Sequence, residues 1–409
     1  MSDPSSTKYP LAAKNKLERE LNLKQLQINS LLSITQAINN NVKAPELFAM
    51  YRSFLTWEME IKKMALFIKE EGSWKCVSHE GISETVLLQA KNVDLERFEK
   101  LQNLTHETRD PFLAQFDVVI PVHHKKQPIA YTLIGGFEEE EDMYNKVRFI
   151  TTITNIIAVA IENKRLFKWQ TEQELAINMQ QMLIPAGLPS GPAFELASIY
   201  KPKLGVGGDY FDCIEIAPGK YVFCVADISG KGIGAALLMA NFQASFRSLI
   251  QQGKPLEKFI HDLNIGLYQV TGGDKFLTLF LVEYSVHTRK LRYINGGHNP
   301  PVFVEDGKKY DLEKGCTILG AFRELPNVEV GEKVISGNAT ICIYTDGLTD
   351  TRNSAGDYFT GEVLGEFATH QASRSASLFN DNLLETLDEF REGQDFPDDL
   401  TVLTCKISA

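Results

Sequence analysis

The chain has 409 residues, of which 44% are hydrophobic and 23% charged, and its formal net charge is −11. This length is too great for one hydrophobic core and predicts about two or three domains, while the composition excludes wholesale disorder. The acidic balance, without any basic run of about five residues, argues against nucleic acid or an anionic membrane as a partner.

The cysteines and the N-terminal residues indicate the compartment. Six cysteines are scattered along the chain without a CxxC pair, which is typical of a reducing compartment. The opening residues, MSDPSSTKYPLAAKNK, lack the apolar stretch of a signal peptide. No run of about 18 apolar residues occurs in the sequence. We therefore expect a cytoplasmic protein that does not enter a membrane.

The N-terminal segment predicts a disordered lead over residues 1–13 and a helix over residues 14–40. Apolar residues recur there at heptad-like spacing, which favours either a coiled coil or one amphipathic helix docked on the next domain. The stripe consists of Leu17, Leu21, Ile28, Leu31 and Ile38, with Lys24 and Thr35 as polar exceptions.

Residues 41–160 predict a small α/β domain. Strands are expected at KKMALFIKE and WKCVSHEG, and as a hairpin about the polar turn 124–127. A long helix is expected over 143–182, ending before Pro185 because the residue before a proline avoids the α region. Its inward positions are expected at Ile153, Ile157, Ala160, Phe167, Leu175, Met179 and Met182.

This order of elements resembles a GAF sensor domain with flanking signalling helices, in which residues 161–187 form a helical linker. The segment carries no recognisable ligand motif. Sensing of an unknown ligand and a purely dimerising or docking role therefore remain open alternatives.

Residues 188–409 predict a separate α+β domain. Apolar β-type runs alternate with Gly- and Asp-rich corners, and Asp306-Gly307 predicts a two-residue hairpin turn. Two helices are expected between YVFCVA and FLTLFLVEY. One carries an apolar face of Leu238, Phe242, Phe246 and Leu249, and the other runs from Pro255 to about Val270. Strands that bracket a helix pair favour sheets covered by antiparallel helices.

Aspartates stand at the ends of the apolar strands of this domain. They are Asp209 and Asp212 in GGDYFD, Asp227 after YVFCVA, Asp346 after TICIYT, and Asp398 and Asp399 before LTVLTCKI. Each motif alone could be an ordinary turn. Together they predict one site, because carboxylates at buried strand ends are costly without compensating cations, and few Lys or Arg lie at matching spacing. Hard divalent ions, Mg²⁺ or Mn²⁺, prefer such oxygen ligands.

Other hydrolytic and nucleotide-binding chemistries lack their signatures. Arg323 follows Cys316 one position too late for the phosphate loop of cysteine phosphatases. Neither a G-x-x-x-x-G-K-[ST] loop nor a G-x-S-x-G elbow occurs. Metal ions that activate a water for in-line attack on a phosphoryl group would supply the chemistry instead.

The C-terminal domain resembles the metal-dependent (PPM) serine/threonine protein phosphatases, in the bacterial branch of stage II sporulation protein E and the sigma-factor-regulating phosphatases. The matching stretches, in the family's order, are MLIPAGLP, GGDYFD, VADISGKGIGAALLMA, YINGGHNPP, LGAF, YTDGLTDTRN and DDLTV. The resemblance implies an αββα sandwich and hydrolysis of phosphoserine or phosphothreonine by a water activated by two Mn²⁺ or Mg²⁺ ions.

Carried over residue by residue, the family pattern assigns roles within this site. The expected catalytic metal ligands are Asp209, Asp227, the backbone carbonyl of Ile228, Asp346 and Asp398. Asp212 and Asp399 would act from further out or through water. Gly207, Gly208, Gly230 and Gly232 would let the backbone approach the metals and the phosphate.

Two positions depart from the family pattern. Asp350 stands where the family usually has Glu, so it stays open whether this shorter side chain makes the contact that the glutamate makes. Lys231 replaces a common histidine, and contact with the phosphate or plain solvation are both open. His298 is interpreted as a structural, hydrogen-bonded histidine.

The same resemblance implies a phosphorylated protein substrate, by analogy a small anti-sigma-factor antagonist. The long helices predict a homodimer regulated through the linker. Two other functions are weighed against this one. The first is a nucleotide cyclase, because GGDYFD is similar to the GG[DE]EF turn of diguanylate cyclases. The second is a catalytically silent, phosphatase-like scaffold.

Overall fold

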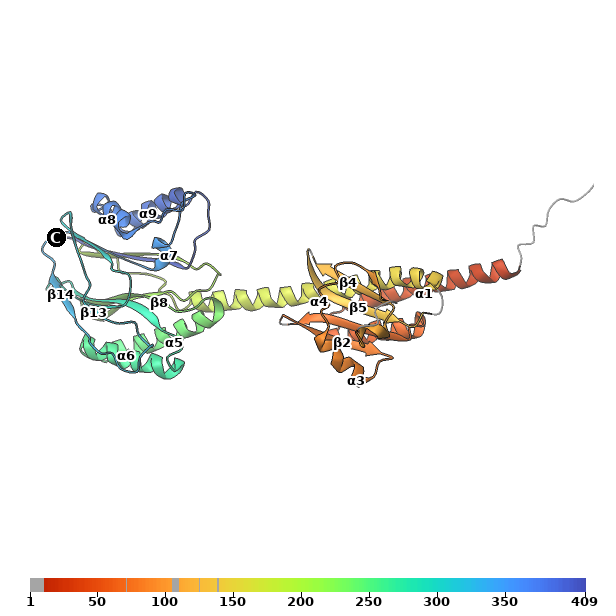
Figure 1. Ribbon diagram of the computed structural model, residues 1–409. Helices are drawn as coiled ribbons and strands as arrows, with labels where there is room; N and C mark the ends of the chain where they lie inside the picture. Colours follow the sequence, from red (N-terminus) through yellow and green to blue (C-terminus); the bar gives the residue numbers. More distant parts are fainter. Residues whose placement is uncertain (1–10, 71, 105–109, 125, 138–139) are drawn as a thin grey trace, which may run out of the picture. The chain divides into compact units, whose positions relative to one another are not determined.

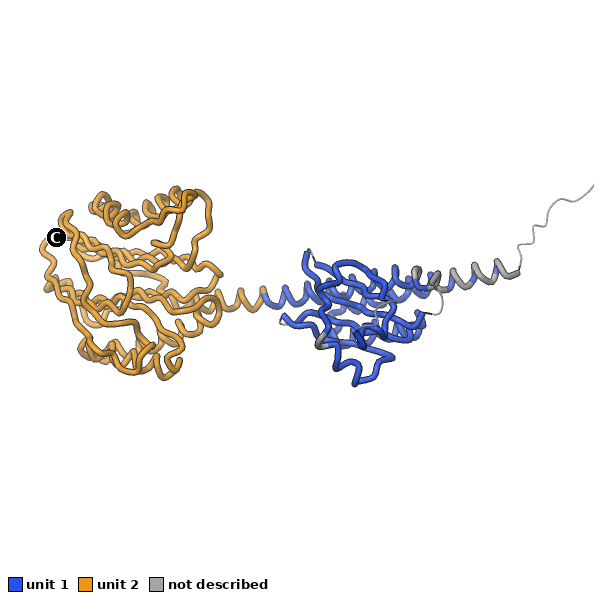
Figure 2. The backbone as a smooth tube through the Cα atoms, viewed as in Figure 1, with its two compact units in different colours: residues 1–169 blue, residues 170–409 orange. Residues whose placement is uncertain are grey.

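A computed structural model describes residues 11–70, 72–104, 110–124, 126–137 and 140–409. The chain divides after Trp169 into two compact units (Figures 1 and 2). This boundary falls within the predicted linker 161–187. Of the expected lead, residues 1–10 lie outside the described residues, and the first helix begins at Leu11.

The N-terminal unit is built on a five-stranded antiparallel sheet with the order β2-β1-β5-β4-β3. Its strands are β1 (Lys63–Glu70), β2 (Ser73–Glu80), β3 (Gln102–Asn103), β4 (Val118–His124) and β5 (Gln127–Gly135). The predicted strands are confirmed, and β4 and β5 form the predicted hairpin about residues 124–127.

Helices cover one face of this sheet. They are α1 (Leu11–Asn39), α2 (Ala44–Ser53), a π-helical turn (Phe54–Glu58) and the first part of α4 (Glu140–Gln181). The opposite face lies under the segment that holds α3 (Glu84–Leu87) and two short 3-10 turns, Leu88–Asn92 and Leu113–Gln115. Ile34, Tyr51 and Ile150 are buried on the first face, and Phe98 and Phe112 on the second.

The two predicted helical stripes are only partly buried within the chain. Leu31 and Ile38 of α1 pack against the core of the N-terminal unit, whereas Leu21 and Ile28 are exposed. The side chain of Leu17 lies outside the described residues. In α4, Ile153 and Ile157 are buried and Ala160 is half-buried, but the later positions are exposed. These exposed positions are Phe167, Leu175, Met179 and Met182.

The C-terminal unit stacks two sheets. One has the order β13-β10-β9-β8-β7, with β14 paired to β10, and the other has the order β12-β11-β15-β16-β6. The strands of the first sheet are β7 (Tyr210–Ala217), β8 (Lys220–Ile228), β9 (Leu277–Ser285), β10 (Lys290–Gly296), β13 (Gly315–Cys316) and β14 (Gly331–Val334). Those of the second are β6 (Phe194–Lys201), β11 (Val302–Glu305), β12 (Lys308–Tyr310), β15 (Ala339–Tyr344) and β16 (Leu400–Ile407).

Helices cover the outer face of each sheet (Figure 1). They are α5 (Gly232–Ile250) and α6 (Leu256–Thr271) on the first sheet, and α7 (Asp346–Thr349), α8 (Gly361–His370) and α9 (Ala376–Phe390) on the second. A third core of aromatic and aliphatic side chains fills the space between the sheets. The α+β class and the predicted αββα sandwich are confirmed, and β11 and β12 form the predicted hairpin at Asp306-Gly307.

Within the described residues, α5 is the one helix long and apolar enough to cross a membrane by length and composition. Met239, Phe242 and Phe246 of this helix are buried in the core beneath the first sheet. Such packing is that of a core helix in a folded domain.

Candidate metal and phosphate site

Antiparallel pairing brings the predicted aspartates to one end of the sandwich. Asp209 directly precedes β7 and Asp227 lies near the end of β8, and these strands pair with Tyr210 opposite Ala226. Asp346 follows β15 while Asp398 and Asp399 precede β16, and Tyr344 lies opposite Val402. In an antiparallel pair the end of one strand lies beside the start of the next. Each sheet therefore contributes its acids at the same edge.

Asp209 is held across the gap between the two sheets. Its side chain is buried, with 2% of its surface exposed. One oxygen, Oδ2, accepts hydrogen bonds from Thr345 Oγ1 at 2.8 Å and from Thr401 Oγ1 at 2.6 Å. Thr401 lies in β16 of the second sheet, and Thr345 directly follows β15 of that sheet. Sequence reasoning missed them, although each lies within two residues of a predicted aspartate.

Burial and mutual repulsion perturb the acids of this cluster. Burial, and then the charge of Asp227, raise the pKa of Asp209 well above its ordinary value. The pKa of Asp227 is raised to about 7, first by burial and then by Asp346, Asp398 and Asp399. Burial followed by the charges of Asp350 and Asp398 raises the pKa of Asp346. Such shifts are expected where several carboxylates share too few cations.

Asp399 braces the glycine loop that leads into β7. Its Oδ2 accepts the Gly208 N–H at 2.8 Å and its Oδ1 accepts the Lys203 N–H at 2.9 Å. A Cβ on Gly207 would collide with this carboxylate, and one on Gly208 would lie 2.5 Å from the carbonyl oxygen of Ile228. Glycine is thus required at both positions by close approach. The expected backbone ligand, the Ile228 carbonyl, faces this same loop.

Lys231 supplies a cation to the cluster. Its Nζ lies 2.6 Å from Asp398 Oδ2, and this bond is the main cause that raises the pKa of Lys231. The Asp399 N–H donates to the other oxygen, Asp398 Oδ1, at 2.9 Å. Each oxygen of Asp398 therefore has one contact within the chain, and Lys231 competes with a metal ion for this carboxylate.

Asp212 does not take part in this cluster, so the expectation that it acts there through water is corrected. Its carboxylate is fully buried and forms a two-point ion pair with Arg247 of α5, with Nε at 2.7 Å and Nη2 at 2.9 Å. Tyr210 Oη donates to the same carboxylate at 2.5 Å. Side chains alternate along a strand, so Tyr210 and Asp212 both face α5, whereas Asp209 faces the other sheet.

His298 is a structural residue, as predicted. Its ring is buried, and Nδ1 lies 2.7 Å from Thr278 Oγ1. Thr278 is the cross-strand partner of Asp227. Burial lowers the pKa of His298 to about 4, so the ring is neutral at physiological pH and is poorly suited to donate a proton to a leaving group.

Gln180, near the end of α4, is a further residue that sequence reasoning missed. It is buried and forms two hydrogen bonds with Gly207, from Nε2 to the carbonyl at 2.7 Å and from the Gly207 N–H to Oε1 at 3.0 Å. Asp209 follows Gly207 by two residues. The linker helix therefore contacts the loop that positions a predicted ligand.

The donor set fits hard divalent ions. It consists of carboxylates and one carbonyl, and its raised pKa values show an excess of negative charge that a cation would relieve. The side chains are not already gathered around one point, since the described part of the chain has no three His, Cys, Asp or Glu side chains placed to hold one ion together.

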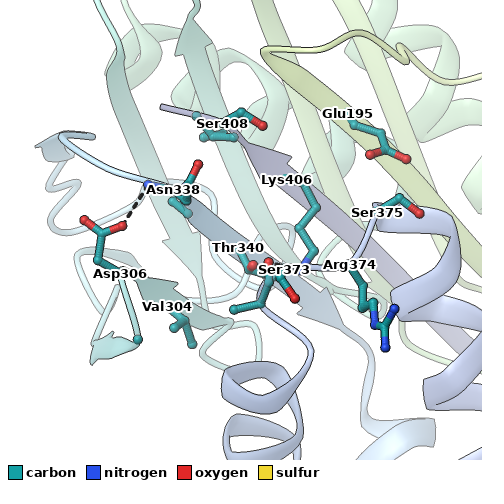
Figure 3. Close-up of a pocket in the computed structure, with 14 residues that line it drawn as sticks. Glu195, Val304, Asp306, Asn338, Thr340, Ser373, Arg374, Ser375, Lys406 and Ser408 are labelled. Atoms are coloured by element: carbon teal, nitrogen blue, oxygen red, sulfur yellow. Dashed lines mark hydrogen bonds between the residues drawn. The ribbon is translucent and has the colours of Figure 1, made fainter.

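A polar cavity lies at the other end of β16 from the aspartate cluster (Figure 3). It has a volume of about 500 Å³, and its lining includes Glu195, Asp306, Arg374 and Lys406. The Lys406 ammonium is already bound by Thr340 Oγ1 at 2.9 Å and by the carbonyls of residues 371 and 372. This cavity holds mixed charges in place of an acidic cluster, and we assign it no catalytic role.

Comparison with known proteins identifies relatives of this chain. Residues 217–408 match the family described as Stage II sporulation protein E (SpoIIE). The chain is 24% identical over 295 residues to Phosphoserine phosphatase RsbU of Bacillus subtilis, covering 70% of this chain and 85% of RsbU. It is also 24% identical over 191 residues to Phosphoserine phosphatase RsbP of the same organism, covering 45% of this chain and 47% of RsbP.

Among solved structures, the SiaA PP2C domain of Pseudomonas aeruginosa aligns with 59% of this chain and 97% of that domain, with a TM-score of 0.52 and 19% identity. A likeness at this level of identity establishes the fold. The family match does not reach the N-terminal unit, so its GAF-like character stays a prediction.

Proposed function

The C-terminal domain is a SpoIIE-type domain of the metal-dependent (PPM) protein phosphatases, and from this premise we propose that the chain hydrolyses phosphoserine or phosphothreonine in a partner protein. One observation carries the proposal. Five aspartates from two sheets, Asp209, Asp227, Asp346, Asp398 and Asp399, meet at one end of the sandwich beside a single ion-paired lysine.

One set of residues at the site would bind the metal ions. Asp209, Asp227, Asp346, Asp398 and the Ile228 carbonyl would hold two Mn²⁺ or Mg²⁺ ions. When bound, such ions neutralise phosphoryl oxygens and lower the pKa of the attacking water.

The neighbouring residues would orient the acids. Thr345 and Thr401 fix the orientation of Asp209 through hydrogen bonds across the sheets. Asp399 holds the glycine loop in place, and neutral His298 supports Thr278 beside Asp227. These contacts would orient the acids for the charge that develops in an in-line phosphoryl transfer.

The proposed substrate is a phosphorylated anti-sigma-factor antagonist, or a small protein of that kind. The support is the likeness to RsbU and RsbP, which are named phosphoserine phosphatases. The chain spans 85% of RsbU and 47% of RsbP.

We further propose that the N-terminal unit regulates the phosphatase through a homodimer formed along α4. Leu175, Met179 and Met182 are 60%, 61% and 83% exposed in the single chain, and they follow one another at spacings of four and three residues. Such an apolar stripe suits a second copy of the same helix. The contact of Gln180 with Gly207 gives this helix a direct path to the site.

Two alternatives remain to be compared with this function. The PP2C-like fold argues against the nucleotide cyclase, because its sandwich already gives the later aspartates a place beside Asp209. A silent scaffold would lack metal aspartates, and here Asp209, Asp227, Asp346 and Asp398 are all present.

The test is phosphate release from a panel of phosphorylated antagonist proteins, incubated with the full-length chain and Mn²⁺. The proposal expects release from at least one member and no cyclic dinucleotide from labelled GTP. Intact phosphoproteins across the panel, together with no hydrolysis of p-nitrophenyl phosphate, would support the scaffold.

A further inference from the structure

A lysine that sequence reasoning did not single out, Lys275, lies beside the glycine loop of the site. Strand β8 ends at Ile228 and β9 begins at Leu277, and these two residues are cross-strand partners. The segments that follow Ile228 and precede Leu277 therefore leave the sheet at the same edge as Asp227.

Hydrogen bonds tie these two segments together. The Ser229 N–H donates to the Phe276 carbonyl at 2.9 Å, and the Phe276 N–H donates to Ser229 Oγ at 3.1 Å. Thr271 Oγ1 also donates to the Lys275 carbonyl at 3.2 Å. The backbone on either side of the Lys275 side chain is thus fixed against the loop 229–232.

The ammonium of Lys275 lies over Gly230. A Cβ built on Gly230 would lie 3.1 Å from Lys275 Nζ, and Gly230 has a φ of +114°, where side chains are strongly disfavoured. Glycine therefore lets the ammonium lie close to the loop, where a side chain would crowd it. Because the Lys275 side chain is exposed, a phosphate oxygen could reach its ammonium from solvent.

The lysines of this edge differ in what they bind. Lys231 Nζ is paired with Asp398, and Lys203 Nζ donates to the Pro397 carbonyl at 2.5 Å. Lys275 is exposed, and its ammonium has no hydrogen bond or ion pair to any residue in the part of the chain that the structure describes. Of these three cations, Lys275 is the one available to an incoming anion.

We propose that Lys275 binds the phosphoryl group of the substrate at this site, and that it, rather than Lys231, is the protein's own phosphate contact. This inference rests on the proposed function. The ligand is a phosphate monoester dianion or the inorganic phosphate released from it. A dianion that approaches several carboxylates is repelled, and a nearby ammonium offsets part of that repulsion.

The experiment uses the full-length protein saturated with Mn²⁺, with p-nitrophenyl phosphate as substrate and inorganic phosphate as product inhibitor. Lys275→Ala is compared with the charge-retaining Lys275→Arg and with the control Lys258→Ala, an exposed lysine on α6. Mn²⁺ affinity is measured for each variant by calorimetry, so that damage to the metal site is recognised.

Lys275→Ala should raise KM and the phosphate inhibition constant each by about tenfold, the loss of one charge-assisted contact, with kcat changed by less than about threefold. Lys275→Arg should keep KM and the phosphate inhibition constant close to their wild-type values. Mn²⁺ affinity should stay unchanged in these variants, and Lys258→Ala should behave as wild type. Equal phosphate inhibition in Lys275→Ala and Lys258→Ala would overturn the inference, as would an effect on Mn²⁺ affinity alone.

Failure of the proposed function would look different, because the wild type would then not hydrolyse the substrate at all. In that case the inference is tested by calorimetry, which measures the binding of inorganic phosphate to the Mn²⁺-loaded wild type and to Lys275→Ala. Weaker binding to Lys275→Ala supports the contact, and binding that is equal or absent in both proteins overturns it.

Discussion

Asp227→Asn should have opposite effects on stability in the absence and in the presence of metal. In the folded protein the pKa of Asp227 is raised from 3.8 to about 7, first by burial and then by Asp346, Asp398 and Asp399. The ionised carboxylate therefore opposes folding at about pH 8. A rise in pKa of this size corresponds to roughly 4 kcal/mol, and the asparagine removes the charge while keeping the shape.

The assay is denaturant unfolding of the full-length chain in EDTA, following the transition of the C-terminal unit. At about pH 8 the variant should be more stable than wild type by roughly that amount. The gain should shrink as the pH falls from about 7 to about 4, because protonation then neutralises the wild-type carboxyl.

With saturating Mn²⁺ the order should reverse, because the wild type gains stability from ligand binding that the variant loses. The same substitution should lower the rate of phosphate release by about 10²-fold or more. A variant that is less stable than wild type in EDTA at high pH would refute the reasoning, since Asp227 would then be a structural acid.

Three further predictions concern the residues around the site. Gln180→Ala removes two buried hydrogen bonds to Gly207. It should lower Mn²⁺ affinity, measured by calorimetry, and turnover by about tenfold, while circular dichroism shows unchanged secondary structure. Wild-type values would exclude a link between the linker helix and the metal site. Arg247→Met leaves Asp212 buried without its partner and should destabilise the C-terminal unit by about 3 kcal/mol, whereas unchanged unfolding would contradict the ion pair's role. Met179→Glu should weaken the dimer in sedimentation and change turnover together, and a monomeric wild type with the same turnover would make α4 a tether.

The sequence predicted the candidate site best where potential metal ligands stand at the ends of predicted strands. The aspartates at the ends of apolar runs were recognisable because buried carboxylates are costly without a compensating cation. The strand and helix order predicted sheets covered by antiparallel helices, and the resemblance to the PPM phosphatases implied the αββα sandwich. Asp212 was assigned wrongly, although the signal was present. It lies three positions after Asp209, and an odd offset places the two side chains on opposite faces of an extended chain.

Other contacts of the site were out of reach because they depend on tertiary pairing. Arg247 lies 35 residues beyond Asp212, and Thr401 lies 192 residues beyond Asp209. Lys275 gave no signal of its own, because its place above Gly230 depends on the pairing of β8 with β9. The apolar stripes of the helices were recognisable in the sequence. The partner that covers their exposed positions could not be predicted, because a contact with a second chain leaves no separate pattern in this sequence.

The central claim is that metal ions held by these aspartates carry out the hydrolysis, and metal removal and add-back tests it most directly. Phosphate release by the full-length wild type is measured in Mn²⁺, after EDTA, and after renewed Mn²⁺, beside Asp346→Asn and a thiol-alkylated sample. The account predicts that activity disappears in EDTA, returns with Mn²⁺, is lost in Asp346→Asn and survives alkylation. Full activity in EDTA, or an unimpaired Asp346→Asn, would contradict it.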